Sequence, residues 1–519
     1  MMKSKLTASI FAFILTAVSV GITANADAYI AYYDKNSRII DVKTIQRDCT
    51  DVDLNEYANF YAPNDSVSGK IFKFADGWWK TNTVEITKER DRLSYTQKAP
   101  NVTDDMCLPQ YWTGDSDYDL VLSKREIKEL NVRILNSENT MMNDLDNLAE
   151  TYNGKAVAEA QSGFASPTGM YLDGKPVAES YYDAIRKNIK NEKLSKNEKV
   201  RYGICTERTV MKAYPYDDWL SDSEWDKEWD EFVNTAVLFG EPLVLYNTTA
   251  DGAFVYAKSV CCEGWVKTED VAVCENKTEW IKAKEHKNFL VVTGERVWLE
   301  PSYDEDLSKK QLTMATVLEL TESSSFEQLN RLAWNNYTVV LPVRNSDGSY
   351  AEKTALISAN RDVNIGYMPY TRANVISQAF KSLGNRYGWG GMLDSQDCSS
   401  FVREVYLCFG IVIPRNTTWQ AAMPVRVIDI SQMTDDEKKA ELDKTPSGSI
   451  LFFRGHEMIY LGTENGLYYT VNDVSSLVDP ENPEGGIIRP RSVIINDLST
   501  LRGNGTTWLS NLTTIAVIE

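Results

Sequence analysis

The stretch Tyr387-Gly-Trp-Gly-Gly-Met-Leu-Asp-Ser-Gln-Asp-Cys-Ser-Ser-Phe401 places a cysteine, Cys398, directly after a glycine-rich turn. From Ser399 to Phe409 apolar residues recur at helical spacing, which predicts an amphipathic helix that begins at this cysteine. Unpaired N–H groups and the positive end of the helix dipole favour a thiolate there and lower the thiol pKa. The same N–H groups can stabilise an oxyanion. The stretch predicts a nucleophilic Cys398, whereas Cys408, without polar neighbours, is expected in the core.

A nucleophilic cysteine needs a general base, and the chain has only two histidines. His456 begins a predicted strand directly after Arg454-Gly455, whereas His286 lies in a charged stretch that is typical of a solvated surface. We therefore expect His456 to be the base.

A third side chain should orient the imidazole ring, and Asn472 and Asp473 both lie at the end of a later predicted strand. If the intervening loop is only Asn465-Gly466, strand alternation puts Asp473 on the same face as His456, whereas a loop one residue longer selects Asn472. The sequence pattern leaves both open.

The region from 367 to 519 is predicted to be an α+β domain. Apolar residues recur at helical spacing in 374–383, which predicts a helix there. Strands are expected at 449–453, 457–461 and 467–471, and the last two are expected to form a hairpin.

The rest of the chain divides into regions of different pattern. Residues 27–105 carry no clear chemistry, and 106–195 are partly helical, with Ser123 and Glu126 as a capping box. Short strands and turn signals at 200–276 and 286–362 predict two small β-barrels, the alternative being one larger β domain. Trp225 and Trp229 could form a sugar platform, although packing of a short helix is favoured.

The N-terminus has the layout of a secretory signal peptide. Two lysines precede an apolar stretch from Leu6 to Ile22 and then small residues. This layout predicts cleavage before Asp27, which removes residues 1–26, or alternatively before Tyr29, and a periplasmic or secreted product. The alternative is an uncleaved anchor. In an exported chain the eight cysteines would first be interpreted as disulfides, with Cys49–Cys107 possible and Cys205 bonded to Cys261, Cys262 or Cys274.

Composition narrows the functional classes. The 519 residues suggest three or four domains at roughly 150 residues each. A formal net charge of −19 without a basic run argues against nucleic-acid binding. With two histidines and no paired C-x-x-C motifs, neither a histidine-rich metal site nor a zinc ribbon is expected.

These motifs resemble the NlpC/p60 family of cell-wall cysteine peptidases. The resemblance rests on the Y-x-W-G-G run at Tyr387, on Asp397-Cys398-Ser399, and on the strand that carries His456. Residues 200–276 and 286–362 resemble the two bacterial SH3 domains of one branch, and 106–190 resemble its N-terminal clip domain.

The resemblance implies a papain-like fold in which Cys398 attacks a peptide carbonyl and His456 transfers the proton. Asn472 falls where relatives usually carry histidine, Tyr387 matches a tyrosine beside the thiol, and Trp389 belongs to the same substrate-facing motif. The branch cleaves the bond between γ-D-glutamate and a diamino acid in peptidoglycan stem peptides. Asp397 and Ser399 match residues that hold the free amine of the leading L-Ala, and the first SH3 module is expected to close that end. A monomer without cofactor, metal or membrane span after cleavage is implied.

Two departures from the family pattern bear on activity. Ser400 replaces the usual glycine, and Asn472, a neutral amide in place of histidine, stabilises an imidazolium less. The alternatives are a non-catalytic protein that binds cell-wall peptides, and a thiol amidase or acyltransferase on the same fold.

Overall fold

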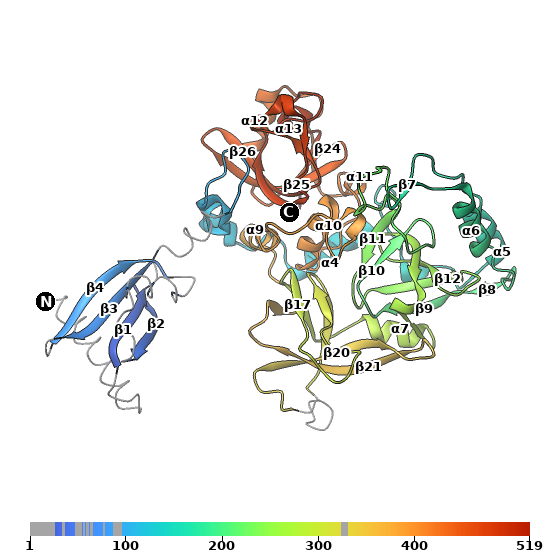
Figure 1. Cartoon of the computed structure of the whole chain (residues 1–519), viewed down its shortest axis with the longest axis horizontal. Helices are drawn as coiled ribbons and strands as arrows, with labels where there is room; N and C mark the ends of the chain where they lie inside the picture. The colour runs from blue at the N-terminus through green and yellow to red at the C-terminus, as the bar shows by residue number, and fades with distance from the viewer. Residues whose placement is uncertain are drawn as a thin grey trace. The chain divides into compact units, whose positions relative to one another are not determined.

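The computed structural model describes residues 26–33, 37–46, 54, 58, 62, 66–75, 78–86, 96–322 and 331–519 (Figure 1). The chain forms two compact units, residues 1–97 and 98–519. The expected signal peptide, apart from its last residue, and Cys49 lie outside the described residues. In the described part of the chain, no helix combines the length and apolar character that a membrane span requires.

The first unit is an antiparallel sheet in the region for which the sequence indicated no clear chemistry. Its strands lie in the order β2-β1-β3-β4, and Ile30 and Tyr32 are fully buried in its core. The bounds are β1 (Ala26–Tyr33), β2 (Ile39–Gln46), β3 (Ser68–Ala75) and β4 (Trp78–Glu85).

The C-terminal part of the second unit is built on a six-stranded antiparallel sheet. Its order is β23 (Arg426–Asp429), β30 (Thr514–Val517), β24 (Ile450–Phe453), β25 (His456–Glu464), β26 (Leu467–Val474) and β29 (Ser492–Asp497). The predicted strands and the α+β arrangement are confirmed.

Helices cover both faces of this sheet (Figure 1). On one face α9 (Arg372–Phe380) and α10 (Cys398–Leu407) bury apolar side chains with those of β24, β25 and β26. On the other face α12 (Asp435–Leu442) and α13 (Trp508–Asn511) share a second apolar cluster with the sheet. The short α11 (Thr417–Gln420) follows α10.

The hairpin between β25 and β26 decides which residue faces His456. Its loop is the two-residue turn Asn465-Gly466, with φ of +52° and +77°, for which simple alternation predicts Asp473. However, a β-bulge between Tyr460 and Gly462 shifts the pairing by one residue. The shift places Asn472 on the same face as His456 and turns Asp473 to the opposite face, so the two-residue loop did not predict the partner.

Two further sheets precede this domain. The first β module has the order β11 (Val233–Val237), β10 (Thr209–Lys212), β14 (Glu263–Lys267), β13 (Phe254–Lys258), β12 (Pro242–Thr248), β9 (Arg201–Cys205) and β15 (Val271–Cys274). The second β module has the order β21 (Tyr350–Ser358), β20 (Asn336–Arg344), β19 (Val317–Leu320), β16 (Phe289–Val292) and β22 (Val363–Ile365), with β17 (Arg296–Trp298) paired to β18 (Gln311–Thr313).

Each of these two sheets has its own buried apolar cluster. Among the described strands no sheet closes into a barrel, so the expected closed β-barrels are not observed. The assignment of the modules as SH3-like stays a prediction.

The partly helical region contains α4 (Lys124–Leu135), α5 (Gly154–Ser162) and α6 (Glu179–Ile189), and α7 (Lys277–Lys284) follows the first β module. The Ser123–Glu126 capping box at the start of α4 is confirmed. Helix α4 packs in the same apolar cluster as α9 and α10. Three two-stranded pairs complete the fold: β5 (Thr151–Tyr152) with β8 (Glu198–Lys199), β6 (Tyr171–Leu172) with β7 (Lys175–Pro176), and β27 (Leu477–Val478) with β28 (Ile487–Ile488).

The glycine-rich turn before Cys398 packs directly against strand β11. Gly390 and Gly391 both have positive φ, and a Cβ added to either would lie within 2.6 Å of atoms of Val233 or Ala236. Only glycine allows this close approach, which fixes the turn against the first β module.

We expect Gly391→Ala to lower the midpoint of thermal unfolding more than Gly384→Ala. Both glycines have positive φ, so a side chain strains either backbone by about 1–2 kcal/mol. Only at Gly391 does the new Cβ also collide, 2.6 Å from Ala236 Cβ, which adds about 1–3 kcal/mol of overpacking. No atom lies within 4 Å at Gly384. If calorimetry shows equal decreases of the unfolding midpoint in the two variants, the close packing of Gly391 against Ala236 is contradicted.

Candidate active site

Cys398 is the first residue of α10, as the sequence predicted. Asp397 caps the helix: its Oδ1 accepts the N–H of Ser400 at 2.9 Å, and the Ser400 hydroxyl accepts the N–H of Asp397 at 2.8 Å. Ser400 therefore completes a capping box and contributes to fixing the position of Cys398.

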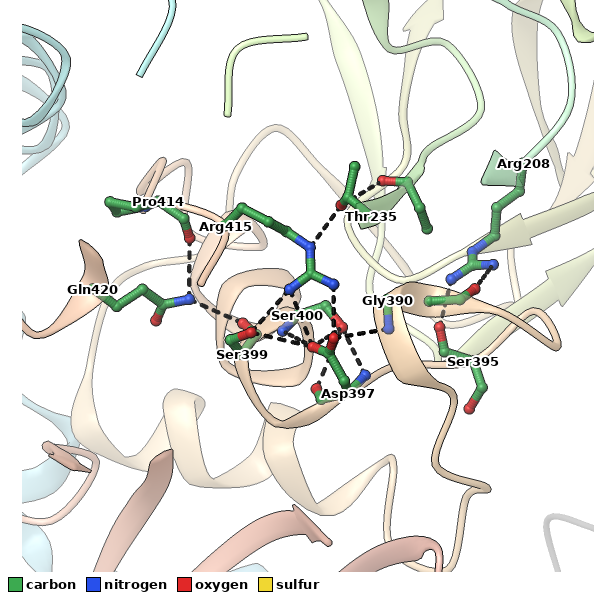
Figure 2. Close-up of polar contacts among 12 residues, drawn as sticks. Arg208, Thr235, Gly390, Ser395, Asp397, Ser399, Ser400, Pro414, Arg415 and Gln420 are labelled. Carbon is green, nitrogen blue, oxygen red and sulfur yellow. Dashed lines mark hydrogen bonds and ion pairs between the residues drawn. The ribbon is translucent and has the colours of Figure 1, made fainter. Parts of the chain in front are cut away.

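A buried ion pair holds this helix start in place (Figure 2). The guanidinium of Arg415 donates to Asp397 Oδ1 at 3.1 Å and Oδ2 at 2.7 Å, and its Nε donates to Thr235 Oγ1 at 2.7 Å. Gly390 N–H also donates to Asp397 Oδ2. Although burial opposes ionisation, Arg415 and these hydrogen bonds hold the pKa of Asp397 below its usual value.

The two residues expected to hold a substrate amine are both committed to this network. The Ser399 hydroxyl accepts from Arg415 Nη1 at 2.9 Å and donates to Asp397 Oδ1 at 3.2 Å, and both residues are about 95% buried. The structure thus gives Asp397 and Ser399 internal partners that a ligand amine would have to displace.

His456 is the first residue of β25, and its Nε2 lies 2.9 Å from Asn472 Oδ1. Burial between the Phe453 and Trp508 rings lowers the pKa of His456 to about 4, against the contribution of Asn472, which raises it. The imidazole is therefore neutral at physiological pH.

A chain of amides fixes the tautomer of this neutral ring. Asn496 Nδ2 donates a hydrogen bond to the backbone carbonyl of Asp497, which can only accept. The other polar atom of this amide, Asn496 Oδ1, is therefore the acceptor of the hydrogen bond from Asn472 Nδ2, 2.7 Å away. Asn472 then presents its carbonyl oxygen to His456, so Nε2 carries the proton. Nδ1 is left as the basic nitrogen. Nothing in the sequence around Asn496 indicates its role, because that role depends on strand pairing.

Cys398 and His456 line one cavity of about 380 Å³, together with Tyr387 and Trp389. A second cavity of about 790 Å³ meets the first at Cys398, and its lining includes Asp397, Ser399 and residues of the first β module. Of the expected site residues, six therefore lie around two adjoining cavities, and Asn472 is fully buried behind His456.

Trp229, from the segment before β11, forms part of the first cavity. It stacks on Tyr387 with ring centroids 6.0 Å apart and an interplanar angle of 3°, and on Trp389 at 5.4 Å. The segment that carries Trp225 and Trp229 contains no helix, so the short helix favoured from the sequence was wrong. Trp229 instead connects the first β module to the site.

The thiol does not have the lowered pKa that its position at a helix N-terminus predicted. Burial raises the pKa of Cys398 well above its ordinary value of 9.0, and the negative charge of the nearby Asp397 raises it further. Desolvation thus outweighs the effect of the helix end, and the resting pair is a neutral thiol and a neutral imidazole.

The alternative third residue, Asp473, is fully buried, and neither carboxylate oxygen has a hydrogen-bond partner. Burial raises the pKa of Asp473 well above its ordinary value, which makes it a neutral core group.

The remaining candidates lie away from the two cavities. His286 is not a solvated surface residue: its side chain is only 15% exposed and its Nδ1 lies 3.7 Å from Glu319 Oε2. Cys408 is fully buried in the core, as expected. The seven described cysteines are free thiols, so the expected bridges from Cys205 do not form.

The comparisons with known proteins agree with this geometry. Residues 384–492 match the NlpC/P60 family model. A dipeptidyl-peptidase 6 of Lysinibacillus sphaericus is 32% identical over 92 residues, which is 18% of this chain and 30% of that relative. The chain's match thus spans about a third of the relative's length.

A solved structure with a similar fold is described as a novel NlpC/P60 endopeptidase from Photobacterium damselae subsp. piscicida. It is 16% identical, with a TM-score of 0.62 over 79% of this chain and 96% of that one. The C-terminal part of the chain is an NlpC/P60 domain, as the resemblance implied.

Alkylation of Cys398 by iodoacetamide is expected to be slow at neutral pH and to accelerate as pH rises above about 9, because only the thiolate reacts. Mass spectrometry of the labelled peptide measures the rate, and the fully buried Cys408 serves as the unreactive control. A fast, constant rate between about pH 5 and pH 8 would instead reveal a resting thiolate–imidazolium pair.

The amide chain predicts a single neutral Nε2–H tautomer of His456 in ¹⁵N NMR spectra. Asn496→Ala removes the acceptor that orients Asn472 and should produce a mixture of tautomers. Thr470→Val removes the weaker 3.2 Å contact of Asn472 Nδ2 and the 3.4 Å contacts of the Thr470 hydroxyl with Asn496. It leaves Asn496 Nδ2 bonded to the Asp497 carbonyl, so it should preserve the single tautomer. An unchanged tautomer in Asn496→Ala would exclude this positioning role.

Proposed function

We propose that the protein is an exported cysteine endopeptidase that hydrolyses the γ-D-Glu–diamino acid bond of peptidoglycan stem peptides with a free N-terminal L-Ala. The observation that carries the proposal is one cavity lined by Cys398 and by a histidine whose Nε2 is held by Asn472. This donor set is the thiol, imidazole and amide of papain-like catalysis.

In the proposed mechanism, Cys398 Sγ attacks the scissile carbonyl while its proton passes to His456 Nδ1. The oxyanion is stabilised by N–H groups at the start of α10. His456 then protonates the leaving amine, and a water molecule, deprotonated by the same nitrogen, hydrolyses the thioester. Because the resting pair is neutral, proton transfer accompanies the attack rather than preceding it.

Tyr387 and Trp389 line the cavity beside the thiol. Burial raises the pKa of Tyr387 well above its ordinary value, so its phenol stays protonated and can donate a hydrogen bond to the substrate. Trp389 lines both cavities, which supports its proposed contact with the peptide on either side of the scissile bond.

The second cavity supports the requirement for a free N-terminus. Its lining includes Met141 and Asn143, before the first β module, and Glu231 and Glu263, all outside the C-terminal sheet. Lys258 pairs with Glu263 at 2.7 Å, whereas Glu231 has no cation partner in the described part of the chain. We assign the substrate amine to Glu231, while Asp397 and Ser399 shape the cavity wall through Arg415.

The raised thiol pKa favours one alternative, a non-catalytic protein that binds cell-wall peptides through the same cavities. The export that the N-terminal sequence predicts would place either protein with peptidoglycan, and both would act as monomers. The amidase or acyltransferase alternative differs in its acceptor, because the acyl group would pass to an amine.

Cys398→Ala should abolish release of diaminopimelate from L-Ala-γ-D-Glu-diaminopimelate, with a loss of about a thousand-fold or more in kcat. Cys408→Ala, which removes a core thiol, should keep the wild-type reaction. Mass spectrometry of the products measures both, with an N-acetylated peptide as a substrate that should resist cleavage.

Binding without turnover in the wild type would establish the non-catalytic alternative. A product joined to an added amine would establish acyl transfer. Equal activity of the two cysteine variants would exclude Cys398 as the nucleophile.

A further inference from the structure

Besides the neutral His456, the lining of the first cavity contains one charged side chain. Arg502 follows β29 and lines the cavity together with Cys398, His456 and Trp508, and no carboxylate belongs to this lining. Arg502 was not singled out in the sequence, because nothing in its neighbourhood there connects it with Cys398.

Arg502 has no carboxylate partner within salt-bridge distance in the described part of the chain. Its guanidinium lies 4.4 Å from the centroid of the Phe453 ring, and its terminal nitrogens are 3.5 Å from the backbone carbonyl of Arg454. These are weak contacts for a partly buried cation, so most of its donor capacity is available to a ligand.

The loop that carries Arg502 is held by backbone hydrogen bonds. Arg502 N–H donates to Thr506 O and Gly505 N–H donates to Arg502 O, both at 2.8 Å, and Leu501 pairs with Thr507. The backbone of this turn is therefore fixed, and the guanidinium that it carries lines the cavity together with His456, where it can bind an anion.

The two cavities differ in charge. The second contains the carboxyl group of Glu231 without a cation partner, whereas the first contains the unpaired Arg502. A peptide that crosses Cys398 with its amine in the second cavity places the residue after the scissile bond in the first. Charge complementarity then favours a negative group on the leaving residue.

We propose that Arg502 binds a carboxylate of the leaving diamino acid residue and thereby determines which stem peptides are cleaved. This inference rests on the proposed function. The carboxylate has two sources: the distal carboxyl group of diaminopimelate, which lysine lacks, and the α-carboxyl group of a diamino acid at the end of the peptide. The lysine side chain ends in an ammonium group alone, so in a lysine peptide only a free α-carboxyl group could contact Arg502.

Four peptides separate the two sources. They are L-Ala-γ-D-Glu-X with X as diaminopimelate or lysine, each with a free α-carboxyl group or an α-carboxamide. Arg502→Gln should lower kcat/KM about 10- to 100-fold for peptides that carry the bound carboxylate, the range expected for a charge-assisted hydrogen bond. The lysine carboxamide, which has neither carboxylate, should be nearly unaffected.

The lysine carboxamide also corrects for any effect of Arg502 on His456, because that effect is common to all four peptides. Arg454→Gln is the matched control, since it removes a neighbouring exposed arginine that does not line the cavity. It should leave the preference among peptides unchanged.

If Arg502→Gln lowers kcat/KM for the diaminopimelate peptides but not for the lysine peptides, Arg502 binds the distal carboxylate. If it lowers kcat/KM for the peptides with a free α-carboxyl group but not for the carboxamides, Arg502 binds the α-carboxylate. Equal losses for all four peptides, or no loss for any, would overturn the proposal. Calorimetric titration of the same peptides into Cys398→Ala, with and without Arg502→Gln, reports the Arg502 contact without turnover. The proposed function can therefore fail in the activity assay while the carboxylate contact is still tested by binding.

Discussion

The position of Cys398 depends on the buried ion pair between Asp397 and Arg415. The two side chains are only 7% and 5% exposed, and their bidentate contact joins the helix cap, the glycine-rich turn and, through Thr235, the first β module. Removal of one partner from such a pair costs about 3–5 kcal/mol, because the other charge stays buried. The start of α10 is therefore fixed by charge and by close glycine packing together.

The same burial that fixes the site also determines its protonation. Cys398, Glu457 and Asp473 all have raised pKa values, whereas His456 has a lowered one, so the groups around the thiol, apart from the ion pair, rest in their neutral forms. In that state the direction of proton transfer is set by geometry. The amide chain from Asp497 through Asn496 and Asn472 leaves Nδ1 of His456 as the acceptor. A neutral amide, that of Asn472, is sufficient for this orientation.

The sequence predicted the features that local pattern controls. The helix at Cys398, the strand at His456, the Asn465-Gly466 turn and the Ser123 capping box follow from spacing and capping chemistry. The choice of Asn472 was not predictable, because one bulged residue near Leu461 reverses the alternation. Arg415, Trp229, Asn496 and Arg502 reach the site only through tertiary packing. The shift of the Cys398 thiol pKa was predicted in the wrong direction, because the sequence shows the start of a helix but not how deeply the thiol is buried.

The most direct test of this account is a crystal structure of the protein reacted with L-Ala-γ-D-Glu whose γ-carboxyl group is replaced by a thiol-reactive vinyl sulfone. We expect one covalent adduct on Cys398 Sγ, with the peptide amine toward Glu231 and the sulfone substituent toward Arg502. An adduct on another cysteine, or a peptide bound in the reverse direction, would contradict it.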